Sequence, residues 1–254
     1  MHFKGMARAI FKKFGYEVWN IRQPHIYSED GLSTHHVHDF INNARFQSAY
    51  SRAIKANGSD HHMRWRAHVA LWVAQQVIKL PGDFVECGVS TGFLTSAIMH
   101  DLGWNDIGKN FWLFDTWSGL DANEVTDAEG AAGRLDWYSN LDYDKVKANF
   151  DEFEGVHMVR GSVPASLNTV DITQVCYLSL DMNCVGPEIQ AAAHFWPKIV
   201  PGGFMLLDDY AYSGYEAQHV AFDAFANEHG FQILSLPTGQ GLAIKPFEVG
   251  SLSS

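Results

Sequence analysis

The chain has 254 residues, of which 46% are hydrophobic and 19% charged, and its formal net charge is −11 at pH 7. This length and hydrophobic content allow one large domain with a sizeable core. The acidic balance argues against a nucleic acid as the main partner, because binding a phosphate backbone requires a basic surface. The three cysteines lack metal-ligand spacing, so we expect reduced thiols in a cytoplasmic protein.

Residues 1–24 are predicted to form an amphipathic basic helix. Hydrophobic residues recur at helical spacing on one face, and Lys4, Arg8, Lys12 and Lys13 flank that face. One interpretation is a peripheral contact with a membrane surface. The other, which we prefer, is a helix docked on the domain or on a second subunit. The basic residues break the pattern of a signal peptide, and no hydrophobic run is as long as a membrane-spanning helix.

A polar segment, residues 25–60, is rich in His, Asn, Ser and Gly. Its histidines have no regular spacing, so we interpret them as loop and cap residues rather than metal ligands. Residues 63–80 show helical periodicity, which Pro81-Gly82 ends. We therefore divide the chain into an N-terminal helical and lid segment, residues 1–80, and a single catalytic unit, residues 81–254.

Beyond Pro81, hydrophobic runs typical of buried strands alternate with stretches of helical periodicity. This alternation predicts a mainly parallel sheet with helices on both faces. The turn at residues 237–240 is too short for a crossover helix, so the last two strands must form an antiparallel hairpin. The predicted fold is α/β, with a Rossmann-like doubly wound, mostly parallel seven-stranded sheet. The predicted strands are Phe84–Cys87, Phe111–Phe114, Val156–Val159, Val175–Leu180, Phe204–Leu207, Phe231–Leu236 and Gly241–Lys245, and helices between them include Gly92–Leu102, Pro187–Trp196 and Gln218–His229.

A glycine-bearing turn, Gly88-Val89-Ser90-Thr91-Gly92, follows the first of these strands and begins a helix. Gly88 and Gly92 would let a ligand approach the backbone closely, and the start of the helix offers free N–H groups. The turn lacks the third glycine of the dinucleotide fingerprint, and Glu86 lies in the strand just before it. A pyrophosphate would be poorly accommodated beside this carboxylate, whereas a cofactor with amino-acid and sulfonium charges would be favoured.

Polar residues also follow the second and third predicted strands. An acid at the position of Asp115 commonly binds the two hydroxyls of a ribose, and the alternative is a helix cap or turn residue. Because the glycine turn lies one strand earlier, we favour the ribose role. Gly161 and Ser162 follow the third strand, where an adenine ring would pass.

Three aspartates stand at the ends of the fourth and fifth predicted strands. Asp181 closes the fourth, and Asp208 and Asp209 close the fifth. The carboxyl ends of neighbouring parallel strands meet at the edge where open α/β sheets bind ligands. Converging carboxylates suit a hard cation such as Mg²⁺. Each acid alone is equally compatible with a helix cap, but their conjunction with the glycine turn favours a metal site.

Six stretches carry a resemblance to a known family, and they are Pro81–Val89, Phe114–Leu120, Leu180-Asp181, Pro201-Gly202-Gly203, Asp208-Asp209-Tyr210 and Pro237–Gly241. Together they resemble the class I S-adenosylmethionine-dependent methyltransferases. More narrowly, they resemble the TylF-like family of metal-dependent sugar O-methyltransferases, which includes the macrocin and mycinamicin enzymes. The resemblance covers about residues 64–246 in the expected order and is specific for the family, not for a substrate.

The resemblance implies S-adenosylmethionine and Mg²⁺ as cofactors and a sugar-containing small molecule as the methyl acceptor. We also expect a homo-oligomer. The expected cofactor-binding residues are Glu86, Gly88, Ser90, Thr91, Gly92, Asp115, Thr116, Gly161 and Ser162. The expected metal ligands are Asp181, Asp208 and Asp209, and the expected catalytic residues are Asp181, Asn183 and Asp208.

One departure from the family pattern concerns the general base. The family often has Asp-x-Asp after the fourth strand, whereas this chain has Asp181-Met182-Asn183. A neutral amide cannot take a proton at physiological pH. Three solutions stay open: Asp181 acts as both ligand and base, a histidine of the lid serves as base, or the metal alone acidifies the acceptor hydroxyl.

The segment from Gly119 to about Tyr143 is long, acidic and without strand pattern, which predicts a lid over the carboxyl edge of the sheet. Aromatic residues near the site are candidates for stacking on a sugar, although aromatic residues more often belong to the core. These residues are Trp117, Trp137, Tyr138 and Tyr212.

Several other functions compete with this hypothesis. A catechol or phenolic O-methyltransferase would have Asp-Asn where this chain has Asp208-Asp209. A methyltransferase of a lipid-linked or surface polysaccharide would use residues 1–24 as a membrane tether. A catalytically silent binding module would explain Asn183 as a lost base. The missing third glycine and the antiparallel final hairpin disfavour an NAD-dependent oxidoreductase.

Overall fold

The computed structural model describes residues 2–16 and 26–247 of the chain. The chain divides into two compact units, Met1–Asp39 and Phe40–Ser254. The secondary structure of the first unit comprises α1 (His2–Lys13), β1 (Tyr27–Glu29), β2 (Leu32–Thr34) and the start of a short 3₁₀ turn, η1 (Asp39–Asn42). The two strands form an antiparallel hairpin. None of the helices within the described ranges combines the length and the hydrophobicity needed to cross a membrane.

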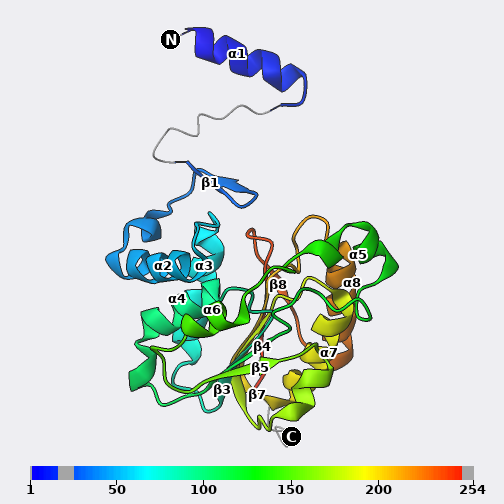
Figure 1. Ribbon diagram of the computed structural model, residues 1–254. Coiled ribbons are helices and arrows are strands. Elements are labelled where there is room, and N and C mark those ends of the chain that lie inside the picture. Colours follow the sequence, from blue (N-terminus) through cyan, green and yellow to red (C-terminus); the bar gives the residue numbers. More distant parts are fainter. Residues whose placement is uncertain (1, 17–25, 248–254) are drawn as a thin grey trace, which may run out of the picture. The chain divides into compact units, whose positions relative to one another are not determined.

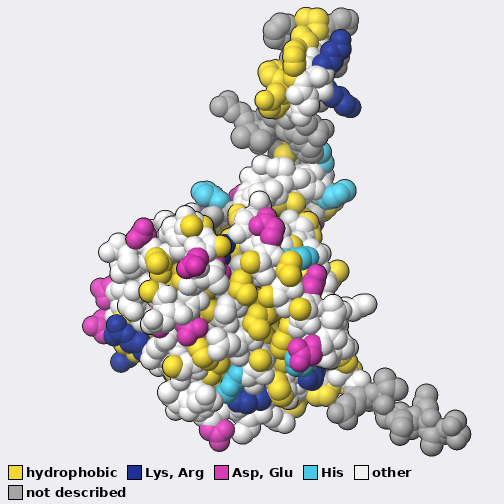
Figure 2. Space-filling view, turned by 90° about the vertical axis from the view of Figure 1, so that its right-hand side faces the viewer, with side chains coloured by type: hydrophobic (Ala, Val, Ile, Leu, Met, Phe, Trp, Pro, Cys, Tyr) yellow, Lys and Arg dark blue, Asp and Glu magenta, His cyan; other side chains and the backbone are white. Residues whose placement is uncertain are grey.

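Helix α1 has the amphipathic pattern that the sequence predicts. Met6, Ile10 and Phe11 are exposed, and two lysines lie in the last turn, where they interact favourably with the helix dipole. Figure 2 shows hydrophobic side chains along one side of this helix and basic side chains on another. Residues 17–24 of the predicted helix lie outside the described residues.

The second unit is built on the predicted seven-stranded sheet. Its order is β5-β4-β3-β6-β7-β9-β8, the first five strands pair in parallel, and β9 is antiparallel to both of its neighbours. The strands are β3 (Asp83–Cys87), β4 (Phe111–Asp115), β5 (Val156–Arg160), β6 (Val175–Leu180), β7 (Ile199–Leu207), β8 (Leu234–Ser235) and β9 (Gly241–Ile244). The chain order reverses on either side of β3, which places the ligand-binding crevice of such sheets beyond the carboxyl end of that strand.

Two strands differ in extent from the sequence prediction. β7 begins at Ile199 and continues through the glycines that precede Phe204, where the sequence indicates a turn. β8 comprises only Leu234–Ser235 of its predicted span. Phe231 is instead buried against Trp196, with the two ring centroids 3.9 Å apart. Packing of this aromatic pair therefore shortens the edge strand.

Helices cover both faces of the sheet (Figure 1). One face packs against α2, α3, α4 and α6, and the other packs against α7 and α8. The helices are α2 (Ala44–Asn57), α3 (Arg64–Val77), α4 (Phe93–Leu102), α5 (Asp127–Ala131), α6 (Tyr143–Ala148), α7 (Val185–Phe195) and α8 (Glu216–His229). Short 3₁₀ turns are η2 (Trp104–Asp106), η3 (Arg134–Asp136), η4 (Ala165–Thr169) and η5 (Trp196–Lys198).

Alternate residues of the central strands enter two different cores. Phe84 of β3 stacks on Tyr177 of β6 in the first core, with ring centroids 5.0 Å apart. Val85 and Leu178, the next residues of these strands, lie in the second core. This arrangement explains why the strands read as continuous hydrophobic runs, since both faces of a parallel sheet are buried.

Helix α2 is an element that the sequence analysis did not predict within the polar segment 25–60. The helix begins after Asn43, whose side chain accepts hydrogen bonds from two N–H groups of the first turn, and ends at Gly58 in the left-handed conformation. Phe46 and Tyr50 are buried on its inner face. Because α2 packs against α4 and α3 packs against β6 and β7, both helices belong to the same compact unit as the sheet. The compact units divide at residue 39, and the division into a helical and lid segment and a catalytic unit at residue 80 stays a prediction.

Candidate active site

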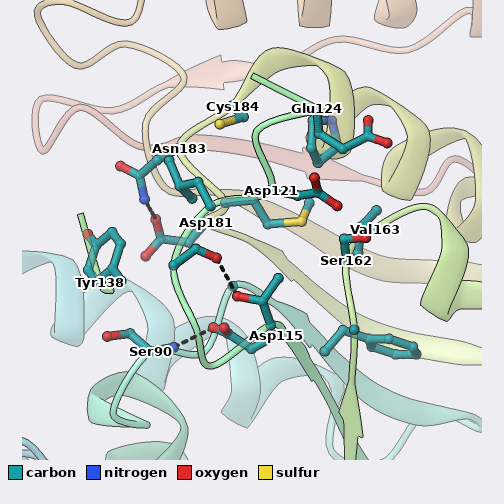
Figure 3. A pocket seen from close by; sticks show the side chains of 18 residues that line it. Ser90, Asp115, Asp121, Glu124, Tyr138, Ser162, Val163, Asp181, Asn183 and Cys184 are labelled. Atoms are coloured by element: carbon teal, nitrogen blue, oxygen red, sulfur yellow. Dashed lines mark hydrogen bonds between the residues drawn. The ribbon is translucent and has the colours of Figure 1, made fainter. Parts of the chain in front are cut away.

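A pocket opens at the carboxyl ends of β3, β4, β5 and β6, the edge that the sequence analysis selected (Figure 3). Predicted site residues that line it are Gly88, Ser90, Asp115, Thr116, Gly161, Ser162, Asp181 and Asn183. Residues of the predicted lid also line it, namely Gly119, Leu120, Asp121, Glu124 and Tyr138. Predicted residues that are not among its lining are Glu86, Thr91, Gly92, Asp208 and Asp209.

Asp115 joins the turn after β3 to the end of β4. Its Oδ2 accepts hydrogen bonds from the backbone N–H groups of Val89 and Ser90, both at 2.8 Å, and its Oδ1 accepts one from Trp117 at 2.7 Å. Burial raises the pKa of Asp115, and these three backbone donors oppose that effect. The carboxylate therefore fixes the shape of the glycine turn in addition to facing the pocket, where the Ser90 contact is visible in Figure 3.

The glycines of the turn are required by contacts within the protein itself. Gly88 has φ +88°, and a Cβ atom built on it would lie 1.8 Å from the carbonyl oxygen of Asp181. Gly92 has φ +81°, and its Cβ would lie 2.4 Å from the ring of Phe150. The sequence explains these glycines by the approach of a ligand. The structure adds a second reason, because the turn packs directly on the end of β6 and on the segment after α6.

Glu86 and Thr91 lie behind the pocket. Glu86 is buried within β3 and accepts a hydrogen bond from the hydroxyl of Thr95. Burial, followed by repulsion from Asp208 and Asp115, raises the pKa of Glu86 well above its ordinary value. The hydroxyl of Thr91 donates to Oδ1 of Asn57 in α2 at 2.9 Å. These side chains lie behind the residues that line the pocket and support them.

The three predicted metal-binding aspartates gather at the ends of β6 and β7. Asp181 lines the pocket, and its Oδ1 accepts a hydrogen bond from the side-chain amide of Asn183 at 3.2 Å (Figure 3). Burial, followed by repulsion from Asp208 and Asp209, raises the pKa of Asp181 well above its ordinary value. Asp181 is therefore a stronger proton acceptor than an ordinary aspartate.

A buried arginine from α3 neutralises part of this acidic group. Arg66 donates from Nη1 to Oδ2 of Asp208, and its Nη2 lies 3.8 Å from Oδ1 of Asp209. Gln240 donates to the other oxygen of Asp208 at 3.1 Å. The sequence analysis did not find Arg66. Its one signal is a basic residue among the inward-facing hydrophobic positions of α3, where burial of a charge requires a partner.

A second buried arginine anchors the lid. Arg134 donates from Nη1 to the carbonyl oxygen of Asn183 at 2.6 Å and from Nη2 to that of Gly214 at 2.8 Å. Its Nη1 also lies 3.5 Å from Oε1 of Glu129, and the same Glu129 oxygen accepts from the N–H of Val185 at 2.9 Å. The lid thus closes on the loops after β6 and β7. The sequence analysis missed Arg134, although it is the one basic residue between Gly119 and Tyr143.

The aromatic candidates have different environments. Trp117 is buried in the first core, and its indole N–H donates to the carbonyl oxygen of Ser90 at 3.1 Å. Tyr138 lines the pocket. The rings of Tyr212 and Tyr215 lie under the guanidinium groups of Arg66 and Arg134, at 4.6 and 4.2 Å. Tyr138 is therefore the aromatic candidate that faces a ligand directly.

Comparison with known proteins decides the family. The sequence profile of macrocin-O-methyltransferase (TylF) matches residues 58–234, which is more than half of the chain. The chain belongs to this family. The TylF family match includes β3 to β7 and the lid, and hence the whole lining of the pocket.

Curated relatives of this TylF family member are O-methyltransferases of Streptomyces and Micromonospora. The chain is 24% identical over 143 residues to 8-demethyl-8-(2,3-dimethoxy-alpha-L-rhamnosyl)-tetracenomycin-C 4'-O-methyltransferase of Streptomyces olivaceus, covering 52% of this chain and 54% of the relative. It is 25% identical over 142 residues to mycinamicin III 3''-O-methyltransferase of Micromonospora griseorubida, covering 52% and 56%. The chain spans about half the length of the curated relatives that it matches.

Solved structures support the fold. The O-methyltransferase NovP superposes with a TM-score of 0.66 at 16% identity, covering 82% of this chain and 99% of NovP. The calicheamicin methyltransferase CalS11 superposes with a TM-score of 0.59 at 16% identity, covering 81% and 84%. The Rossmann-like methyltransferase fold predicted from the sequence is confirmed.

The residues of this TylF family member do not fit the predicted Mg²⁺ site. Among residues 2–16 and 26–247, no group of three or more His, Cys, Asp or Glu side chains is arranged to hold a metal ion. The oxygens of Asp208 and Asp209 that face Arg66 are engaged by its guanidinium, a cation supplied by the chain. We therefore derive no chemical step through a metal ion.

Proposed function

We propose that the protein is an S-adenosylmethionine-dependent O-methyltransferase that acts on a hydroxyl group of a sugar or of a glycosylated small molecule. Membership of the TylF family supports the reaction class. The names of the tetracenomycin and mycinamicin relatives support a glycosylated acceptor. The formal charge of −11 agrees with an uncharged or cationic ligand better than with a nucleic acid.

One observation carries the proposal: six of the nine predicted cofactor residues line a single pocket together with Asp181, a carboxyl group suited to proton transfer. The turn at Gly88 and Ser90, with Asp115, would hold the amino-acid and ribose parts of the cofactor. Gly161 and Ser162 would border the adenine. Thr116 would line the wall between them, whereas Glu86, Thr91 and Gly92 would act by shaping the turn. Asp181 borders the same space next to the turn, since its carbonyl oxygen lies against Gly88.

S-adenosylmethionine, when bound, supplies an electrophilic methyl group on a positively charged sulfur. The protein must then hold the acceptor hydroxyl in line and remove its proton. We assign proton removal to Asp181, because it lines the pocket and its pKa is raised by burial and by the neighbouring aspartates. The amide of Asn183 would orient Asp181 through its 3.2 Å hydrogen bond. Asp208, held by Arg66 and Gln240, would keep the pKa of Asp181 high through its charge.

The decisive test is calorimetric titration of S-adenosylmethionine and S-adenosylhomocysteine into the wild-type protein and the Asp115→Asn variant. We expect micromolar binding by the wild type and at least about tenfold weaker binding by the variant, because the amide cannot accept from all three backbone donors. Absence of binding to the wild type, with or without EDTA, would contradict the proposal. If S-adenosylmethionine binds, nucleotide sugars and glycosylated metabolites would be tested as acceptors by mass spectrometry, which detects the gain of one methylene group.

The cellular location, the oligomeric state and the role of α1 stay predictions. We propose that the protein acts in the cytoplasm as a homo-oligomer and that α1 provides a contact surface, either for a second copy or for a membrane. Size-exclusion chromatography with light scattering, and flotation with anionic vesicles, separate these two uses of α1. A monomer that does not float would contradict both.

A further inference from the structure

We propose that Arg66 is the resident cation of the Asp208–Asp209 pair, so that the protein itself fills the position a divalent ion would take. The inference rests on contacts among buried residues and does not depend on the proposed methyl transfer. Its experiment therefore measures ion binding directly, and it can fail while the methyltransferase assignment stands.

The ion pair is shielded from water. Arg66, Asp208 and Asp209 expose only 5%, 4% and 6% of their surfaces. Water therefore screens their charges little, and charged groups at such positions require partners. The guanidinium provides donors toward both carboxylates at once, one in a direct hydrogen bond and one at 3.8 Å. A planar guanidinium is suited to hold two acids in this way.

Further contacts hold Arg66 and Asp208 in place. The guanidinium carbon of Arg66 lies 4.6 Å from the ring centroid of Tyr212. The second oxygen of Asp208 accepts from Gln240, which is fully buried at the beginning of the last strand. Both oxygens of Asp208 therefore have partners within the protein. A metal ion could bind Asp208 only by displacing one of these donors.

The negative charge shared by Asp181, Asp208 and Asp209 explains why Arg66 matters. Asp208 and Asp209 both repel the charge of Asp181, and Arg66 attracts it. Removal of the guanidinium would leave carboxylates close together in a buried place without a compensating charge. Such a group attracts an external hard cation. Loss of Arg66 should consequently convert a partly neutralised cluster into a site for a divalent ion.

The experiment is a calorimetric titration of MnCl₂ into four apo proteins: wild type, Arg66→Met, Arg66→Lys and Arg64→Met. Arg64 is a matched control, because it lies in the same helix and pairs with Asp60 instead. We expect Arg66→Met to bind Mn²⁺ at least about tenfold more tightly than the wild type. Arg66→Lys should restore weak binding, and Arg64→Met should behave as the wild type. Thermal unfolding with and without MnCl₂ should show a stabilising shift for Arg66→Met alone.

The wild-type titration decides the matter even if Arg66→Met does not fold. Tight Mn²⁺ binding by the wild type that Asp209→Asn abolishes would overturn the proposal, because the acids would then hold a metal with Arg66 present. Equal affinity of folded Arg66→Met and wild type would also overturn it. Weak wild-type binding that Asp209→Asn leaves unchanged, with similarly weak binding by Arg66→Lys, would support it.

Discussion

The two ends of the pocket are held together in different ways. At the turn end, Asp115 binds backbone groups of Val89 and Ser90, so the contacts join segments that follow adjacent strands. At the acid end, Arg66 reaches Asp208 across 142 residues, and Arg134 reaches Asn183 across 49. The turn end thus joins two adjacent strands of the sheet, whereas the acid end is assembled from α3, the lid and the final hairpin. Backbone geometry should dominate the first, and buried charge the second.

The sharpest test of the turn end is Gly88→Ala. A methyl group there would meet the carbonyl oxygen of Asp181 at 1.8 Å, so we expect unfolding free energy to fall by about 4 kcal/mol or more. Gly58→Ala is the control, because Gly58 has a similar φ of +85° but nothing within 4 Å of the added atom. It should cost only about 1 kcal/mol. Urea denaturation measures both, and equal losses would show that the close approach to β6 is unimportant.

At the acid end, Asp181→Asn tests chemistry rather than folding. Loss of the proton acceptor should lower kcat/KM by about 10³-fold, a typical contribution of a general base. Binding of S-adenosylhomocysteine should change little, because the turn end holds the cofactor in our proposal. A variant with near wild-type turnover would remove Asp181 from the role of base.

The lid anchor tests whether buried charge stabilises the acid end. Arg134→Met leaves Glu129 buried without its cation, and we expect a loss of about 3 kcal/mol. Arg64→Met removes an ion pair with Asp60 in which both side chains are partly exposed, 27% and 21%, and it should cost about 1 kcal/mol or less. Chemical denaturation of both variants gives the comparison. Similar losses would contradict the importance that we give to burial.

A pH-dependent effect concerns Glu188, which accepts from the N–H groups of Met182 and Asn183. Burial, followed by repulsion from Asp209, raises its pKa from 4.5 to about 8. The folded state therefore holds this proton more tightly than the unfolded state. Its contribution to stability is complete below pH 4.5 and is lost as the pH rises through about 8. Between these pH values, the unfolding free energy of Glu188→Gln should fall less than that of the wild type. Parallel profiles of unfolding free energy against pH for the two proteins would contradict the raised pKa of Glu188.

The same contrast explains how much the sequence could predict. Continuous hydrophobic runs identify strands buried on both faces, so the sheet and the acids at its carboxyl edge were predictable. The turn from Gly88 was predictable as well, because its glycines follow a hydrophobic run in the sequence, whereas its contacts with Asp181 and Phe150 were not. Arg66 was not, because Arg64 and Arg66 look alike in sequence, and only the packing of α3 makes one pair with Asp60 and the other with buried aspartates. Helix α2 was missed because its outward residues are polar.

The shared use of Glu129 has a consequence for the evolution of acceptor range. One of its oxygens completes the capping box with Thr126, and the other holds Val185 at the start of α7 near Arg134. Changes at these positions would release the whole lid at once, whereas a change at the exposed Leu135 leaves these contacts in place. Trp137 is also exposed, but its ring centroid lies 6.0 Å from the guanidinium carbon of Arg134. Directed evolution toward new acceptors should therefore randomise exposed lid positions outside these contacts and keep Thr126, Glu129 and Arg134 constant.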